Sequence, residues 1–132
     1  MPMLDVPVAI PQGKRLEDIE ISSVGICAGS GGSLLHDLDV DLLFTGELSH
    51  HEALAVTEAG RAVIAPFHSN TERGFMHHTA RHLLLDSLQK AWIARGAATP
   101  AASDMERAVW ADNEVEVDVS REDRDPYQLV SF

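Results

Sequence analysis

Three short apolar runs, each followed by a polar loop, most constrain how this chain can fold. The runs cover residues 19–27, 40–45 and 62–65. Runs of this length between turn residues are typical of strands, and the segments after the second and third runs carry the spacing of helices. Because strands alternate with helices, we predict an α/β fold with a mixed or mostly parallel sheet and covering helices.

The length of 132 residues predicts one domain with a core of its own. Residues 1–18 are rich in proline and predict an extended lead-in, so the α/β domain is expected over residues 19–132. Within it, the alanine-rich residues 97–113 predict a surface loop with room for one helical turn. Residues 114–119 alternate valine with acidic residues, which predicts a strand with one buried face.

Two helices are predicted in this domain. The first covers residues 48–59, with Ser49 and Glu52 as a capping box and Gly60 as its end. The second covers residues 70–94 and should bury an apolar face. That face consists of Phe75, Leu83, Leu84, Leu88 and Trp92.

The charge of the chain excludes some classes of partner. It carries 21 acidic and 10 basic residues, for a net charge of −11. Such a surface repels phosphate backbones and anionic lipids, so we expect no direct nucleic-acid or membrane binding. No apolar run is long enough to span a bilayer, and the N-terminus lacks a secretory pattern. With Cys27 as its single cysteine, the chain is expected to be intracellular, in the cytoplasm, nucleus or mitochondria.

Polar loops follow all three predicted strands, at residues 29–33, 46–51 and 68–72. In parallel sheets, ligand sites lie beyond the carboxyl ends of the strands. If the strands are parallel, all three loops meet at one edge of the sheet. This convergence is the first argument for a functional site.

His68 and Glu72 stand four residues apart where a strand should give way to a helix. Residues at this spacing share a helix face, and an imidazole with a carboxylate can hold a divalent metal. Ser69 and Glu72 also spell a capping box, which needs no ligand. The residues alone leave both interpretations open, and two protein ligands are fewer than a catalytic metal normally has.

The remaining motifs are weaker. The glycine loop with Gly29 and Gly31 fits neither the dinucleotide fingerprint nor the P-loop, so a tight turn and a contact with an anionic ligand both stay open. His51 follows a predicted strand and could line a cleft or lie on the surface. His78 and His82 share a helix face, where a solvated surface is the simpler interpretation.

The chain resembles the C-terminal half of the Nif-three-like family, also called the GTP cyclohydrolase I type 2-like family, in its eukaryotic or fungal branch. The resemblance rests on TGELSHHEAL at residues 45–54, HSNTERGF at residues 68–75 and DRDP at residues 123–126. The order and spacing of these blocks match the family, and so does the glycine loop. The resemblance covers residues 19–132.

The resemblance implies a fold of two similar α/β halves facing across a cleft that holds two divalent ions, either zinc, iron or manganese. The N-terminal half of such proteins supplies a histidine pair and an aspartate. The C-terminal half supplies a histidine and a glutamate, which correspond here to His68 and Glu72. Gly29, Gly31, Thr45, Glu47 and His51 would line the pocket. With two of five ligands, this chain is expected to be inactive alone, and its half of the site could lack the metals.

For the complete protein, the resemblance implies a metal-dependent hydrolase of the GTP cyclohydrolase-like kind, assembled as a ring or hexamer. The other reading is a non-enzymatic interaction or assembly module linked to transcriptional regulation through a protein partner. The two differ in a simple test, since only the hydrolase needs the metal ligands.

Overall fold

The computed structural model describes residues 5–98, 103–111, 115–128 and 130. Contacts divide the chain into two compact units, which we describe separately. Unit 1 comprises Met1–Arg73 and Glu122–Phe132, and unit 2 comprises Gly74–Arg121. The expected single domain over residues 19–132 stays a prediction.

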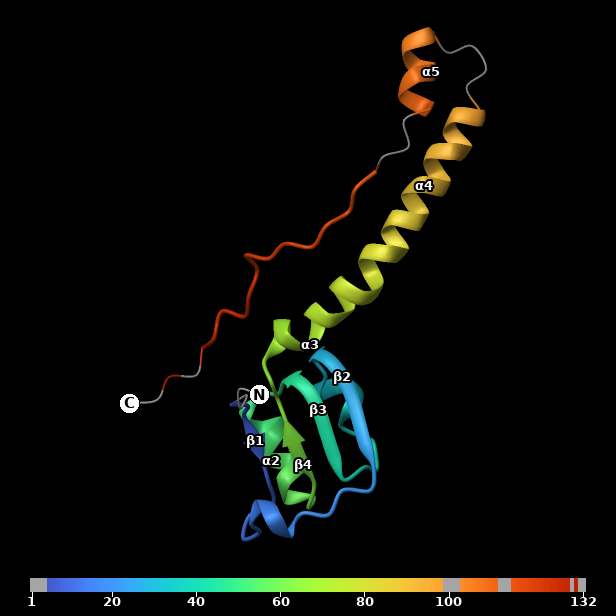
Figure 1. Ribbon diagram of the computed structural model, residues 1–132. Coiled ribbons are helices and arrows are strands. Elements are labelled where there is room, and N and C mark those ends of the chain that lie inside the picture. Colours follow the sequence, from blue (N-terminus) through green and yellow to red (C-terminus); the bar gives the residue numbers. More distant parts are fainter. Residues whose placement is uncertain (1–4, 99–102, 112–114, 129, 131–132) are drawn as a thin grey trace. The chain divides into compact units, whose positions relative to one another are not determined.

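Unit 1 is built on a four-stranded sheet with the order β1-β4-β3-β2 (Figure 1). The strands are β1 (Val8–Ala9), β2 (Val24–Ser30), β3 (Leu42–Glu47) and β4 (Ala62–Ile64). Strands β2, β3 and β4 are parallel, while β1 pairs antiparallel with β4. The predicted α/β fold with a mostly parallel sheet is therefore confirmed.

Residues 5–18, the described part of the expected extended lead-in, also contain regular structure. They contribute the edge strand β1 and the short 3-10 helix η1 (Leu16–Asp18). In β1, Val8 pairs with Ile64 and Ala9 with Val63. A strand of two residues has no measurable periodicity, so the sequence pattern could not reveal it.

The core of unit 1 lies between one face of the sheet and the helices α1 (Gly32–Leu35) and α2 (His50–Glu58). Leu43 of β3 and Val63 of β4 pack there with helix residues Leu35 and Val56. Full burial of each such side chain contributes about 1.5–3 kcal/mol. This core fixes the strand ends from which the site is built.

Helix α2 begins as predicted. The Ser49 hydroxyl accepts a hydrogen bond from the Glu52 amide at 3.4 Å, and the Glu52 carboxylate accepts one from the Ser49 amide at 2.7 Å. These bonds lower the pKa of Glu52, chiefly through the Ser49 side chain. Gly60 follows the helix with φ +82°, the left-handed conformation that glycine adopts easily.

The other face of the sheet carries apolar side chains that remain accessible. Ile26 lies beside Phe44, which lies beside Ile64, so the three form a row across the parallel strands. Ile26 is 73% exposed and Val24, on the same face, is 47% exposed. These three side chains form an accessible apolar row, Ile26–Phe44–Ile64.

The predicted long helix is present as three consecutive elements. They are α3 (His68–Phe75), the π-helical segment η2 (Met76–Ala80) and α4 (Arg81–Ala97). The expected burial of its apolar face is wrong, because α4 has no buried residue and Leu83 is 59% exposed. Within unit 2, α4 continues directly from η2 and packs against α5 (Asp104–Ala111), which is too short to cover a whole helix face.

The region after α4 also differs from expectation. The predicted loop over residues 97–113 contains α5, a full helix, while residues 99–102 and 112–113 lie outside the described part. The strand predicted over residues 114–119 is not formed in the described residues 115–119, although their exposure still alternates. The Val117 carbonyl instead accepts a hydrogen bond from Arg81 Nε at 2.6 Å. Alternation of apolar and polar residues predicts which face of a strand is buried, but a strand also needs a neighbouring strand to pair with.

No helix in the described ranges is both long and apolar enough to cross a bilayer.

Candidate functional site

The ends of β2, β3 and β4 meet at one edge of the sheet, as the parallel order requires. Gly46 at the end of β3 shows how closely they approach. A Cβ atom there would lie 2.7 Å from the Gly29 carbonyl oxygen and 2.8 Å from His68 Cα. Real Cβ atoms do not approach other atoms so closely. Glycine at position 46 therefore allows the end of β3 to contact the backbones of both Gly29 and His68. The predicted convergence of the three loops is observed.

Two threonines hold the glycine loop in place. The Thr45 hydroxyl accepts from the Gly31 amide and donates to the Gly29 carbonyl, both at 3.0 Å. The Gly29 amide donates to Thr71 Oγ1 at 2.8 Å. These two amides are already satisfied by side chains, which favours the tight-turn interpretation of the loop over an anion cradle. Thr45 is fully buried beneath the loop.

The backbone just before α3 is strained, and a carboxylate from the C-terminal segment caps the start of the helix. Phe67, just before the helix, has φ +72°, which is rare for a bulky residue. Strained backbone conformations of this kind are concentrated at functional sites. The Ser69 amide donates to Asp125 Oδ2 at 3.1 Å, and the Tyr127 amide donates to Asp125 Oδ1 at 3.0 Å. Asp125 is only 7% exposed. The C-terminal DRDP block therefore supplies the carboxylate at the start of α3, where a negative charge is favourable.

The Ser69 amide binds Asp125, and the Glu72 side chain contacts His68. Glu72 Oε1 lies 3.2 Å from Nε2 of His68, and Glu47 Oε1 lies 3.0 Å from Nδ1 of the same ring. The imidazole is thus held between two carboxylates, one from β3 and one from α3. All three side chains are between 42% and 51% exposed, so solvent and ligands can reach them.

The two carboxylates raise the pKa of His68 above its ordinary value. The hydrogen bond with Glu47 is the largest cause, and the charges of Glu72 and Glu47 act in the same direction, while partial burial opposes them. Any cation near this ring benefits from the same two negative charges.

The donor set and the space in front of it fit a divalent metal. Imidazole nitrogen and carboxylate oxygen are ligands of zinc, iron and manganese. Gly29, at φ +69°, faces both donor atoms, because a Cβ there would lie 2.8 Å from Glu72 Oε1 and 3.0 Å from His68 Nε2. A side chain at this position would fill the space that a bound ion needs. Among the described residues, no group of three His, Cys, Asp or Glu side chains forms a metal site.

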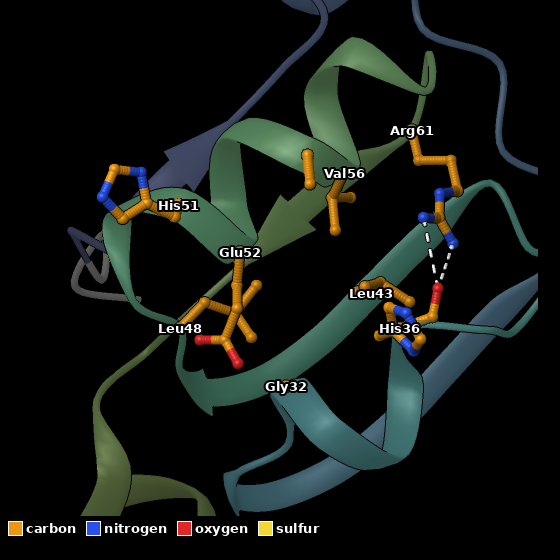
Figure 2. A pocket seen from close by; sticks show the side chains of 9 residues that line it. Gly32, His36, Leu43, Leu48, His51, Glu52, Val56 and Arg61 are labelled. Atoms are coloured by element: carbon orange, nitrogen blue, oxygen red, sulfur yellow. Dashed lines mark hydrogen bonds between the residues drawn. The ribbon is translucent and has the colours of Figure 1, made fainter.

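The other predicted pocket residues are distributed differently. Gly29 and Glu47 lie at the His68–Glu72 pair, whereas Gly31 and Thr45 brace the loop behind it. His51 lies on α2 and lines a separate apolar pocket of about 240 Å³. In Figure 2 its ring lies at one end of this pocket, and His36 and Arg61 lie at the other. His78 and His82 belong to η2 and α4 in unit 2.

Sequence reasoning missed three residues that shape the site. Asp125 caps α3, Thr71 ties α3 to the glycine loop, and Phe67 takes the left-handed conformation. The DRDP block at residues 123–126 was the sign of Asp125 in the sequence, but nothing in it indicated a contact with α3. No local pattern marks Phe67, because aromatic residues rarely have positive φ.

Comparison with known proteins places these features in a family. The profile of the Duf34/NIF3 (NGG1p interacting factor 3) family matches residues 9–97. The NIF3 homolog of Schizosaccharomyces pombe is 48% identical over 85 residues, which is 64% of this chain and 30% of that protein. The NIF3-like protein 1 of Drosophila melanogaster is 58% identical over 72 residues, covering 54% of this chain and 24% of its own length.

Human NIF3-like protein 1 is 34% identical over 125 residues, which is 95% of this chain but 26% of that protein. The crystal structure of Staphylococcus aureus protein SA1388 matches with a TM-score of 0.55 and 19% identity, over 96% of this chain and 33% of that one. This structural likeness supports the fold alone. The chain spans less than a third of the length of these three curated relatives. Since the family profile matches most of the chain, the protein belongs to the Duf34/NIF3 family.

Proposed function

We propose that this chain supplies His68 and Glu72 to a two-metal site in a metal-dependent hydrolase. The carrying observation is the approach of His68 Nε2 and Glu72 Oε1 to 3.2 Å, in front of a glycine whose missing Cβ leaves the space open. Their backbones are fixed by the core of the sheet and by the Asp125 cap. Such preorganisation favours a binding site over a mobile surface pair.

A divalent ion bound here would supply Lewis acidity and a more acidic bound water. The chain's own residues have the task of holding and orienting it. His68 would bind through Nε2, and Glu72 would bind one ion or bridge two. The open side at Gly29 would admit a substrate group, since the loop backbone there has no side chain to obstruct it.

The remaining ligands would come from outside this chain. Its relatives are more than three times longer than the matched segments, and the described residues offer no third ligand at the same ion. The family resemblance implies a second α/β half with a histidine pair and an aspartate. On this basis the chain alone is expected to bind metal weakly and to be inactive.

The test measures bound metal in a full-length relative carrying the equivalents of His68→Ala and Glu72→Ala. After purification and dialysis, elemental analysis should show loss of zinc, iron or manganese in both variants. The equivalents of His51→Ala and Glu58→Ala are matched controls, because these residues lie on α2 away from the pair. Unchanged metal content in the first two variants would refute the assignment.

A second candidate is an interaction module, and two observations favour it. The Saccharomyces cerevisiae relative, 43% identical over 84 residues, is named NGG1-interacting factor 3. Unit 1 also presents the accessible apolar row Ile26–Phe44–Ile64. If this function is correct, Ile26→Asp should weaken binding to yeast NGG1, and His68→Ala should leave that binding intact. Ring assembly remains a further prediction, which light scattering on a full-length relative would check.

A further inference from the structure

We propose that Glu47 is a positioning residue that fixes the tautomer and orientation of His68, so that Nε2 is the atom presented to the metal. This inference rests on the proposed function, because it concerns how the same site selects its ligand atom. It assigns to Glu47 a role distinct from that of Glu72, although both are carboxylates in contact with one ring. It also distinguishes Glu47 from a residue that merely lines the pocket.

The geometry separates the two carboxylates by the nitrogen that each one faces. Glu47 Oε1 lies 3.0 Å from Nδ1, and Glu72 Oε1 lies 3.2 Å from Nε2. An ionised carboxylate can only accept, so the hydrogen bond with Glu47 requires the hydrogen to be on Nδ1. Glu72 can accept from Nε2 in the same way, but it lies at 3.2 Å against 3.0 Å for Glu47, so the shorter hydrogen bond favours the hydrogen on Nδ1. In the neutral ring Nε2 then carries the lone pair, and it faces Gly29 and Glu72 Oε1. Carboxylates in this position commonly orient histidine ligands and increase their basicity.

The backbone around Glu47 is rigid enough for this role. Glu47 is the last residue of β3, where Thr45 and Gly46 before it are buried and Glu47 itself pairs with Ser30 of β2. Thr45 fastens the strand end to the glycine loop, and Gly46 lets the backbone of His68 pack directly against it. A carboxylate on a strand end holds its direction better than one on a loop.

Glu47 is not placed to coordinate the same ion as Glu72. The two side chains contact opposite nitrogens of the imidazole, and no three-residue metal group occurs among the described residues. The competing interpretation is an ordinary surface ion pair, which contributes little and selects nothing. The two interpretations differ in what they predict for the ring nitrogens of His68.

The test uses this chain labelled with ¹⁵N, with Glu47→Ala, Glu47→Gln and the control Glu58→Gln. Glu58 is an exposed carboxylate at the end of α2, so its change removes the same charge from another part of unit 1. Long-range ¹H–¹⁵N spectra are recorded without metal, at a pH where the ring of His68 is neutral. Wild type and Glu58→Gln should show hydrogen on Nδ1. Glu47→Gln keeps an acceptor and should largely keep this pattern, whereas Glu47→Ala leaves Glu72 as the carboxylate in contact with the ring and should move the hydrogen toward Nε2.

Zinc titration provides the second readout. Zinc affinity should fall by about 10–100-fold in Glu47→Ala, with Glu47→Gln between that variant and the wild type. A ring pattern in Glu47→Ala identical to that of Glu58→Gln would overturn the inference. So would X-ray absorption showing that zinc loses an oxygen ligand in Glu47→Ala, because Glu47 would then be a direct ligand.

The outcomes separate this inference from the proposed function. If His68→Ala leaves zinc binding unchanged, the metal site itself is wrong, whatever the tautomer. If His68→Ala abolishes zinc binding while Glu47→Ala matches Glu58→Gln in both readouts, the site stands and only the role of Glu47 fails.

Discussion

Two helix starts in this chain have the same Ser-x-x-Glu pattern and use it differently. At α2, Ser49 and Glu52 form a complete capping box. At α3, the Ser69 amide binds Asp125, and Glu72 contacts His68. The two patterns differ in position, since Ser49 precedes α2 while Ser69 lies inside α3, and they differ in their partner, since Asp125 comes from 56 residues away. At α3 the distant carboxylate of Asp125 binds the amide that a local capping box would use, and Glu72 contacts His68 instead. Four experiments test this comparison.

The largest effect is expected from Asp125→Ala, which leaves the part-buried hydrogen bonds from the Ser69 and Tyr127 amides without their acceptor. Loss of these charge-assisted bonds should lower the free energy of unfolding by about 2–3 kcal/mol, measured by urea denaturation. Asp123→Ala, which removes an exposed ion pair with Arg73, is the control and should cost less than about 1 kcal/mol. Equal losses of unfolding free energy in the two variants would show that the Asp125 cap contributes no more than an exposed ion pair.

A charge-neutral change in each pattern should separate coordination from capping. Glu72→Gln should weaken zinc binding by about tenfold or more, because a direct ligand should matter at least as much as its supporting residues. Glu52→Gln should leave zinc affinity unchanged, since that carboxylate is bonded to Ser49. Calorimetric titration of both variants provides the measurement, and equal affinities would contradict the distinction.

Replacing the serine of each pattern should have a smaller effect, and here the larger loss of stability is expected at α2. Ser49→Ala removes an N-cap and should cost about 1 kcal/mol of unfolding free energy. Ser69→Ala should stay within about 0.5 kcal/mol, because the described contacts at this residue involve its amide and not its hydroxyl. Thermal and urea denaturation of both variants would reveal a reversed order, which would mean that Ser69 caps α3 after all.

The smallest effect is a pH dependence of the metal-free chain. The pKa of His68 is raised in the folded state, mainly by Glu47, while the unfolded ring titrates near about 6.5. The stabilisation is therefore complete below the unfolded pKa and is lost as the pH rises through the folded pKa. Melting temperatures measured across this range should show that loss in the wild type and not in His68→Gln. A steeper loss in His68→Gln would place the effect elsewhere.

Local patterns predicted the parts of the fold that depend on neighbours in sequence. The parallel sheet, the Ser49–Glu52 capping box and the meeting of the strand ends all follow from short-range spacing. The pairing of His68 with Glu72 also follows from helical spacing. The metal itself and the role of the complete site stay predictions.

The rest depends on contacts between distant segments. The alternating valines at 115–119 predicted a strand, yet the described residues there have no ladder. The apolar residues of α4 predicted a buried face, yet Leu83, Leu84 and Leu88 are exposed. Helical periodicity shows which residues share a face, but it does not show which other element covers that face. Asp125 could not be assigned to α3 from the sequence, since nothing local links a tail residue to a helix start.

The Asp125 cap also sets an order of events during synthesis. Unit 1 is discontinuous, and its last segment, Glu122–Phe132, leaves the ribosome after the whole of unit 2. Until Asp125 arrives, the Ser69 amide lacks this distant acceptor, and Glu72 is the carboxylate that the local Ser-x-x-Glu pattern offers it. The growing chain is therefore expected to hold Glu72 in a local cap, and to release it toward His68 only when the tail closes the loop. Hydrogen exchange at the Ser69 amide, compared between the full chain and one ending before residue 122, would follow this exchange of partners.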